Sequence, residues 1–146
     1  MPAKVLIPVD GARNSKTAED YTVRLHEKMP LSVVLLSVID TKDLDGHGLD
    51  PAYKESIIQA KRRFAEKATA EAASNLRAAG IECEKRLLVG HPANLICYTA
   101  QQEGFDMVIM AESGRTDFAD WYLGSVTNNV LYHCRVPVLL VKHPRK

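Results

Sequence analysis

The segment from residue 107 to residue 142 decides the fold of this chain. It reads MVIMA at 107–111, ESGRTDFADWYL at 112–123, GSVTNNVLYHC at 124–134 and RVPVLLVK at 135–142. Apolar runs that predict buried strands thus flank a polar loop with glycines, and Ser125 opens a short helical run. Glycines let backbone N–H groups approach a ligand, and a helix N-terminus carries a partial positive charge. The segment therefore predicts a phosphate site, and a nucleotide is the first ligand to consider.

The rest of the chain alternates in the same way between short apolar runs and longer helical patterns. Parallel strands need such crossover helices, so the alternation predicts a three-layer α/β/α fold with a mainly parallel sheet. A chain of 146 residues without an internal repeat or linker is expected to form a single domain, 1–146. Ligands bind such sheets beyond the carboxyl ends of the strands. The expected strands are 4–9, 31–39, 83–89, 107–111 and 136–141, and the expected helices are 14–29, 51–79, 93–103 and 125–134.

The helix expected at 51–79 is the longest element. It is rich in Ala, Lys, Glu and Arg, and Gly80 ends it. Residues at helical spacing form one stripe along it, as in an amphipathic helix that covers a sheet. The stripe consists of Ile57, Lys61, Phe64, Ala68, Ala72 and Leu76.

The composition excludes several classes of partner. Lys and Arg number 19 and Asp and Glu 18, so a net charge of +1 gives no electrostatic case for nucleic acid or an anionic membrane. No charged-then-apolar leader and no membrane-length apolar run are present, so a cytoplasmic location is expected. The three cysteines lie far apart and show neither zinc-ligand nor redox-dithiol spacing, which predicts buried free thiols.

The loop at 111–125 holds the candidate phosphate contacts. Gly114 and Gly124 can expose backbone donors, Ser125 can bond a phosphate oxygen, and Arg115 can add a charge-assisted contact. The same residues would equally serve a turn, a close packing contact and a helix N-cap. Spacing alone leaves both interpretations open.

Four features together resemble one known family over nearly the whole chain. They are an opening strand that ends in Pro8-Val9-Asp10-Gly11, Gly90-His91-Pro92 before the third helix, an apolar strand followed by a loop of the type Gly-x2-Gly-x9-Gly-Ser/Thr, and a closing Pro-Val-Leu-Leu-Val strand. The chain thereby resembles the universal stress protein family. The resemblance implies an adenine nucleotide alpha hydrolase-like fold with parallel strands in the order 3-2-1-4-5. It also implies a homodimer that binds ATP or another adenine nucleotide, such as AMP.

The resemblance assigns roles to individual residues. Gly114, Gly124 and Ser125 match the second glycine, the third glycine and the hydroxyl residue of the loop motif, and Ala111 replaces the first glycine. Near the adenosine, Asp10 would accept a hydrogen bond from the base or ribose, and Val38 would cover the adenine. The candidate nucleotide-binding residues are Pro8, Val9, Asp10, Val38, Ala111, Gly114, Arg115, Gly124, Ser125 and Val126.

Two departures bear on whether a nucleotide binds. The Cβ of Ala111 can deny the backbone conformation or the close approach that a glycine permits. Glu112, Asp117 and Asp120 exceed the charge of Arg115, so a triphosphate would need a divalent cation such as Mg2+ or Mn2+ at this loop.

The sequence shows no catalytic machinery. The turn after the first strand matches neither the pyrophosphate-releasing ATP enzymes nor the nucleotidyltransferases, and a P-loop is missing. The histidines show no metal-ligand spacing. The first hypothesis is therefore a nucleotide-binding stress or signalling module with at most slow ATP hydrolysis. The alternative is a nucleotide-independent interaction or scaffold protein of the same fold. Either would form a homodimer if the terminal strand, from Val136 to Val141, lies at a sheet edge and pairs across a two-fold axis.

Overall fold

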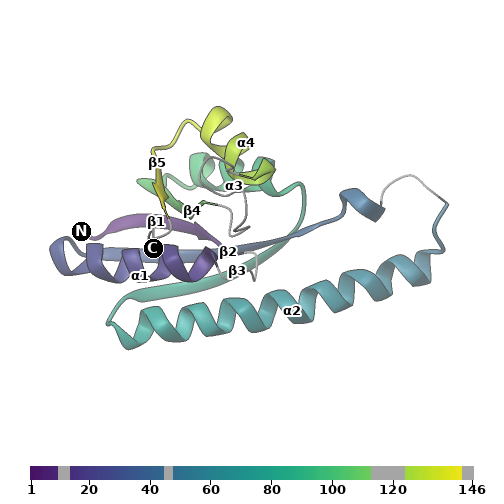
Figure 1. Cartoon of the computed structure of the whole chain (residues 1–146), viewed down its shortest axis with the longest axis horizontal. Coiled ribbons are helices and arrows are strands. Elements are labelled where there is room, and N and C mark those ends of the chain that lie inside the picture. Colours follow the sequence, from purple (N-terminus) through teal and green to yellow (C-terminus); the bar gives the residue numbers. More distant parts are fainter. Residues whose placement is uncertain (10–13, 45–47, 113–123, 143–146) are drawn as a thin grey trace.

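The computed structural model describes residues 1–9, 14–44, 48–112 and 124–142 (Figure 1). All strand pairs are parallel, and the five strands lie in the order β3-β2-β1-β4-β5, which confirms the predicted topology. The strands are β1 (Ala3–Pro8), β2 (Leu31–Asp40), β3 (Glu82–Gly90), β4 (Met107–Ala111) and β5 (Val138–Val141). The helices are α1 (Asn14–Lys28), η1 (Lys42–Leu44), α2 (Pro51–Ala78), α3 (Pro92–Gln102) and α4 (Ser125–His133).

Helices cover both faces of the sheet, so the protein has the three predicted layers. In Figure 1, α1 and α2 lie below the sheet and α3 and α4 lie above it. Strand side chains alternate between the two faces of the sheet. Val5 and Ile7 belong to the core between the sheet and helices α1 and α2, and Leu6 belongs to the core between the sheet and helices α3 and α4. The sheet therefore separates two hydrophobic cores.

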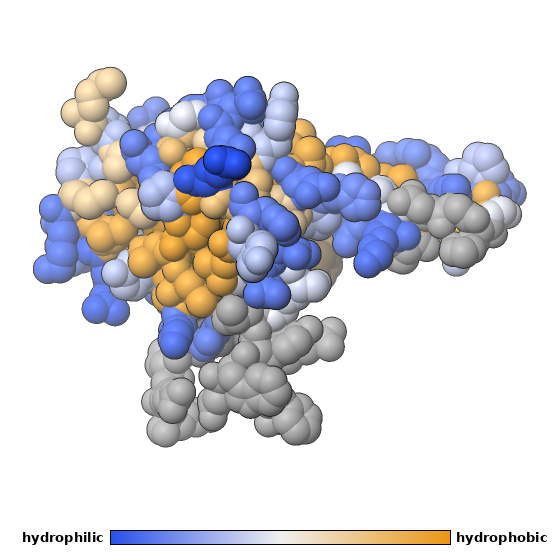
Figure 2. Space-filling view, turned by 90° about the horizontal axis from the view of Figure 1, so that it is seen from above, coloured by the Kyte–Doolittle hydropathy of each residue, from blue (hydrophilic) through white to orange (hydrophobic). Residues whose placement is uncertain are grey.

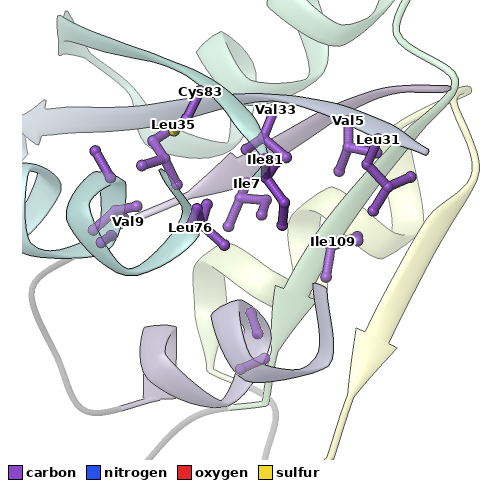
Figure 3. Packing of buried hydrophobic residues seen from close by; sticks show 14 residues of the cluster. Val5, Ile7, Val9, Leu31, Val33, Leu35, Leu76, Ile81, Cys83 and Ile109 are labelled. Atoms are coloured by element: carbon purple, nitrogen blue, oxygen red, sulfur yellow. The ribbon is translucent and has the colours of Figure 1, made fainter. Parts of the chain in front are cut away.

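The larger core lies between the sheet and helices α1 and α2. Figure 3 shows β1, β2 and β4 directing Ile7, Leu35 and Ile109 toward these helices, where Leu76 of α2 meets them. These four side chains are completely buried. Close packing of this kind fixes the strands in register and so holds their carboxyl ends at one edge of the sheet.

Helix α2 covers the sheet with only part of its length. Asp50 caps it through a hydrogen bond that its Oδ1 accepts from the Ala52 N–H at 3.0 Å, and Pro51 occupies the first turn. The amino-terminal part extends beyond the sheet (Figure 1), and the buried residues all come from the second half. The predicted stripe was therefore wrong at Phe64, whose side chain is 63% exposed. The buried residues of α2 are Ala65, Thr69, Ala72, Ala73 and Leu76.

The last strand is shorter than predicted. β5 begins at Val138 instead of Val136, since Pro137 has no N–H to donate to a ladder. The Pro137 carbonyl still accepts a hydrogen bond from the Val108 N–H at 2.9 Å. β5 pairs only with β4 and lies at an edge of the sheet, which meets the condition set for strand pairing across a two-fold axis. None of the helices in the described ranges is long and apolar enough to cross a membrane.

Candidate functional site

A cavity of about 580 Å3 lies at the carboxyl ends of β1, β2 and β4. Its volume is within the range of about 300–1,000 Å3 that is typical of small-molecule sites. The sheet order changes direction between β1 and β4, and α/β sheets bind ligands at such a switch point. The lining residues are Pro8, Val9, Leu36, Ser37, Val38, Ile39, Asp40, Ala60, Lys61, Phe64, Ala65, Pro92, Ile96, Met110, Ala111, Val126 and Thr127.

The floor of the cavity is made by the ends of β1 and β4. The N–H of Val9 donates to the carbonyl of Leu36 at 2.8 Å, which extends the β1–β2 ladder by one residue beyond Pro8. Ala111 of β4 pairs with Val141 of β5, and its methyl group packs into the core between the sheet and helices α1 and α2. Within the described residues, glycines are the only ones with positive φ, so Ala111 has ordinary strand geometry. The backbone at this position does not require a glycine.

The end of β2 is joined to α2 across the cavity. Lys61 Nζ donates to the carbonyl oxygen of Asp40 at 2.8 Å, and Asp40 Oδ1 accepts from the Lys42 N–H at 2.9 Å. Lys61 and Phe64 are one turn apart, so both face the same side of α2, and both line the cavity. This arrangement gives the cavity a wall from α2 that carries an ammonium group and an exposed aromatic ring.

The start of α3 forms another wall. Gly90 has a φ of 150°, and a Cβ at this position would lie 2.9 Å from Leu95 Cδ1. Glycine is therefore suited both to the backbone angle and to the contact with the helix. Pro92 then occupies the first turn of α3, where its missing N–H is not needed. The Gly-x-Pro motif thus brings Pro92 and Ile96 to the cavity.

The amino-terminus of α4 meets the cavity at Val126 and Thr127. Gly124 is the N-cap residue, with φ 77° and ψ 153°. This region of backbone space is essentially restricted to glycine. Ser125 is the first residue inside the helix, so the alternative in which it serves only as an N-cap is wrong. Because Gly124 brings no side chain to cap the helix, the first N–H groups of α4 are suited to receive an anion.

The sequence-predicted residues fall into three groups. Pro8, Val9, Val38, Ala111 and Val126 come together in the lining of the cavity. Gly124 and Ser125 adjoin it at the start of α4 but are not among the lining residues. Asp10, Gly114 and Arg115 lie outside the described residues, as do Asp117 and Asp120 of the acidic loop.

The contribution of α2 is what the sequence reasoning missed. Lys61 and Phe64 were assigned to a core-facing stripe, but they line the cavity together with Ala60 and Ala65. Their spacing was visible in the sequence. The distance by which α2 extends past the end of β2 was not visible in the sequence, because it depends on the register of the helix on the sheet.

The described lining is mostly apolar, with a few charged and polar groups. Among the described residues that line the cavity, Asp40 and Lys61 carry charge, while Ser37 and Thr127 bring hydroxyl groups. The described part of the chain contains no group of three or more His, Cys, Asp or Glu residues that could hold a metal ion. Apolar walls with a few polar groups and a helix N-terminus can accept a flat, partly apolar molecule that carries an anionic group.

Known proteins share both the sequence and the architecture of this chain. A profile described as the Universal stress protein family matches residues 1–142. Universal stress protein MJ0577 of Methanocaldococcus jannaschii is 28% identical over 155 aligned residues, covering 97% of this chain and 96% of the relative. The solved structure of MJ0577 superposes with a TM-score of 0.86 at 27% identity, covering 100% of this chain and 99% of that chain.

Two further solved structures share the fold and contain nucleotides. A universal stress protein in complex with cAMP has a TM-score of 0.67 at 22% identity, with 97% of each chain covered. An Arabidopsis thaliana protein of the family with AMP bound has a TM-score of 0.72 at 18% identity, with 98% and 93% of the two chains covered. The neighbours have the adenine nucleotide alpha hydrolase-like fold that the family resemblance implied, and the strand order of this sheet agrees with it. From its sequence match and its architecture, this chain belongs to the universal stress protein family.

Proposed function

We propose that this chain is an adenine-nucleotide-binding module that acts in stress response or signalling. The observation that carries the proposal is the apolar cavity at the β1/β4 switch point, which the start of α4 adjoins. Val9, Val38 and Ala111 would contact the base and ribose, and the first N–H groups of α4 would bind a phosphate. The AMP and cAMP bound by structural neighbours support an adenine nucleotide as the occupant.

ATP is the proposed physiological ligand, with Mg2+ or Mn2+ as its companion. Mg2+ is commonly held by substrate phosphates and only one or two carboxylates, so a site whose described residues form no metal cluster can accept a nucleotide-bound cation. The proposed module binds and releases the nucleotide, with at most slow hydrolysis. Occupancy would then change which partner the protein contacts.

Calorimetric titration of nucleotide-free protein with ATP and AMP, with and without Mg2+ or Mn2+, tests this proposal. The expected result is saturable binding of ATP and AMP at one site per chain. GTP serves as the control and should bind more weakly. Tighter ATP binding in the presence of the cation would support the metal-assisted form. No binding at millimolar ATP or AMP would contradict the proposal and favour a nucleotide-independent scaffold.

Phe64 provides a test of the α2 wall. We expect Phe64→Ala to weaken nucleotide affinity by about two- to tenfold, because an aromatic contact is worth roughly 0.5–1.5 kcal/mol. Stability should change little, since 63% of this residue is exposed. The matched control is Tyr53→Ala, which removes another exposed aromatic side chain of α2 that does not line the cavity. Equal affinity losses in both variants, or a loss in neither, would remove Phe64 from the site.

We also propose a homodimer formed by pairing of β5 across a two-fold axis. All four residues of β5 are partly exposed, and an unpaired apolar edge strand is prone to associate. Figure 2 shows hydrophobic side chains gathered in the middle of the face seen from above Figure 1, the side that carries α4 and β5. A two-fold axis would turn this edge into a closed, self-complementary interface.

Leu140 is the residue of choice for testing the dimer. Leu139 and Val141 pack against one core and Val138 against the other, whereas Leu140 belongs to neither set. We expect Leu140→Arg to convert a dimer to a monomer, measured by sedimentation or light scattering, while the circular dichroism spectrum is unchanged. The Tyr53→Arg variant, which changes the amino-terminal part of α2 that extends beyond the sheet, should remain dimeric. A monomeric parent protein at high micromolar concentration would contradict the proposal directly.

A further inference from the structure

Two cysteines that are distant in sequence lie side by side between α3 and α4. Cys97 belongs to the second core, and Cys134 packs against that core from the end of α4. Gln101 Oε1 accepts a hydrogen bond from the Arg135 N–H at 3.1 Å. Gln101 lies one turn after Cys97 on the same side of α3, so this bond holds the backbone next to Cys134 against the Cys97 side of the helix.

Both side chains lie at the same core. Burial raises the pKa of Cys97 to about 12, and the neighbouring Cys134 side chain adds to the rise. Cys97 is therefore a protonated thiol at neutral pH, with the sulfur of Cys134 as its neighbour. The sequence spacing gave no sign of this pair, because a strand, a loop and a helix separate the two residues.

The two residues differ in access and in freedom to move. Cys97 is 9% exposed and lies inside α3, whereas Cys134 is partly exposed. Cys134 follows the last turn of α4 with φ −75° and ψ 132°, so its backbone has already left the helix. A residue at such a junction can shift more readily than one within a helix, and a disulfide requires the two sulfurs to approach to about 2.05 Å.

We propose that Cys97 and Cys134 form an oxidative modification site that closes to an intramolecular disulfide in the presence of hydrogen peroxide. The sulfur of the accessible Cys134 attacks the peroxide, the O–O bond breaks, and the departing hydroxide takes up the Cys134 proton, so that Cys134 sulfenic acid and one water molecule are formed. The sulfur of Cys97 then attacks the Cys134 sulfur, the S–O bond breaks, and water leaves with the Cys97 proton. Two thiols are oxidised to one disulfide, and one peroxide is reduced to two water molecules.

The disulfide would join the two helices whose first turns line the cavity. Pro92 and Ile96 of α3 and Val126 and Thr127 of α4 are lining residues. A bond between Cys97 and Cys134 would restrain the chain between them, which includes β4 and the start of α4. Oxidation would thereby restrain the segment that leads into the cavity, without adding a contact inside the cavity itself.

The test treats the full-length protein with hydrogen peroxide, and separately with the thiol oxidant diamide, and counts free thiols after denaturation. The number of free thiols should fall from three in the reduced chain to one after oxidation. Digestion without reductant should yield one linked peptide pair, Cys97 with Cys134, whose mass is lower by two hydrogens than the sum of the free peptides. Dithiothreitol should separate the pair again.

Cys83 supplies the matched control. It is also a buried cysteine whose pKa is raised by burial, but it lies in β3 and packs in the core on the other face of the sheet. Cys83→Ser should still lose two thiols, whereas Cys97→Ser and Cys134→Ser should form no intramolecular disulfide. Three thiols after both oxidants, a disulfide between two chains, or Cys134 sulfinic acid beside a free Cys97 would each overturn the proposal.

Discussion

Replacing Gly124 with valine should reduce adenine-nucleotide affinity by about 100-fold while the protein stays folded. Gly124 has φ 77° and ψ 153°, a conformation that costs a residue with a Cβ roughly 1–3 kcal/mol. Valine would escape this strain by rotating the backbone, which redirects the first N–H groups of α4 away from the cavity. Loss of one or two hydrogen bonds to a charged phosphate accounts for an effect of this size.

The control for Gly124→Val is a valine at a glycine that also has a positive φ and lies far from the site. Gly80, between α2 and β3, has φ 83°, and nothing lies within 4 Å of a Cβ built there. Gly80→Val should therefore lower the melting temperature through backbone strain and leave nucleotide affinity unchanged. Calorimetry and thermal unfolding of both variants separate the two effects. If Gly124→Val binds ATP and AMP as tightly as the parent, the phosphate does not bind at α4.

Filling the cavity from β2 should have an effect of similar size. Val38 is partly buried near the end of β2 and lines the cavity, so Val38→Trp would place an indole where the base is proposed to lie. We expect a loss of at least about 100-fold in affinity for both AMP and ATP, because the base can no longer bury its apolar faces. The loss should be equal with and without Mg2+, since the change lies on the adenosine side.

The neighbouring strand offers a matched substitution. Val89 of β3 pairs with Ile39, one residue beyond the partner of Val38, and it is 44% exposed and outside the lining. Val89→Trp adds the same side chain to the same edge of the sheet and should leave affinity within about twofold of the parent. Full nucleotide binding by Val38→Trp would show that the base lies elsewhere. That result would not affect the prediction for Gly124→Val, which concerns the phosphate.

The strand order and the layers could be predicted because the sequence signals were local and strong. Continuous apolar runs such as the one at Leu31–Asp40 predict strands that are buried on both faces, and the helices between them require parallel pairing. The ends of these strands follow from the same pattern, and Val9, Val38 and Ala111, which the family resemblance assigned to the site, lie together in the lining of the cavity. At Pro137, the missing N–H explains a boundary that apolarity alone placed two residues too early.

The parts that could not be predicted depend on contacts between distant segments. Phe64 fits a helical stripe, but whether that stripe faces a core or a cavity depends on where α2 ends relative to β2. The proximity of Cys97 and Cys134 results from the packing of α3 on α4, to which no sequence spacing corresponds. Of the two grounds for concern about Ala111, the unusual backbone conformation does not arise, because the residue continues β4 in ordinary strand geometry. The closeness with which a ligand can approach its Cβ stays a prediction.

The separation of the two hydrophobic cores has a consequence for cooperativity. The cavity is bordered by Val9 and Ala111 from one core and by Leu36 and Ile96 from the other. A ligand there would contact both sides of the sheet and would favour states in which both are folded. Amide hydrogen exchange should therefore slow together in α2 and α3 when the ligand is added. In its absence we expect the two helical layers to open independently, each on its own side of the sheet.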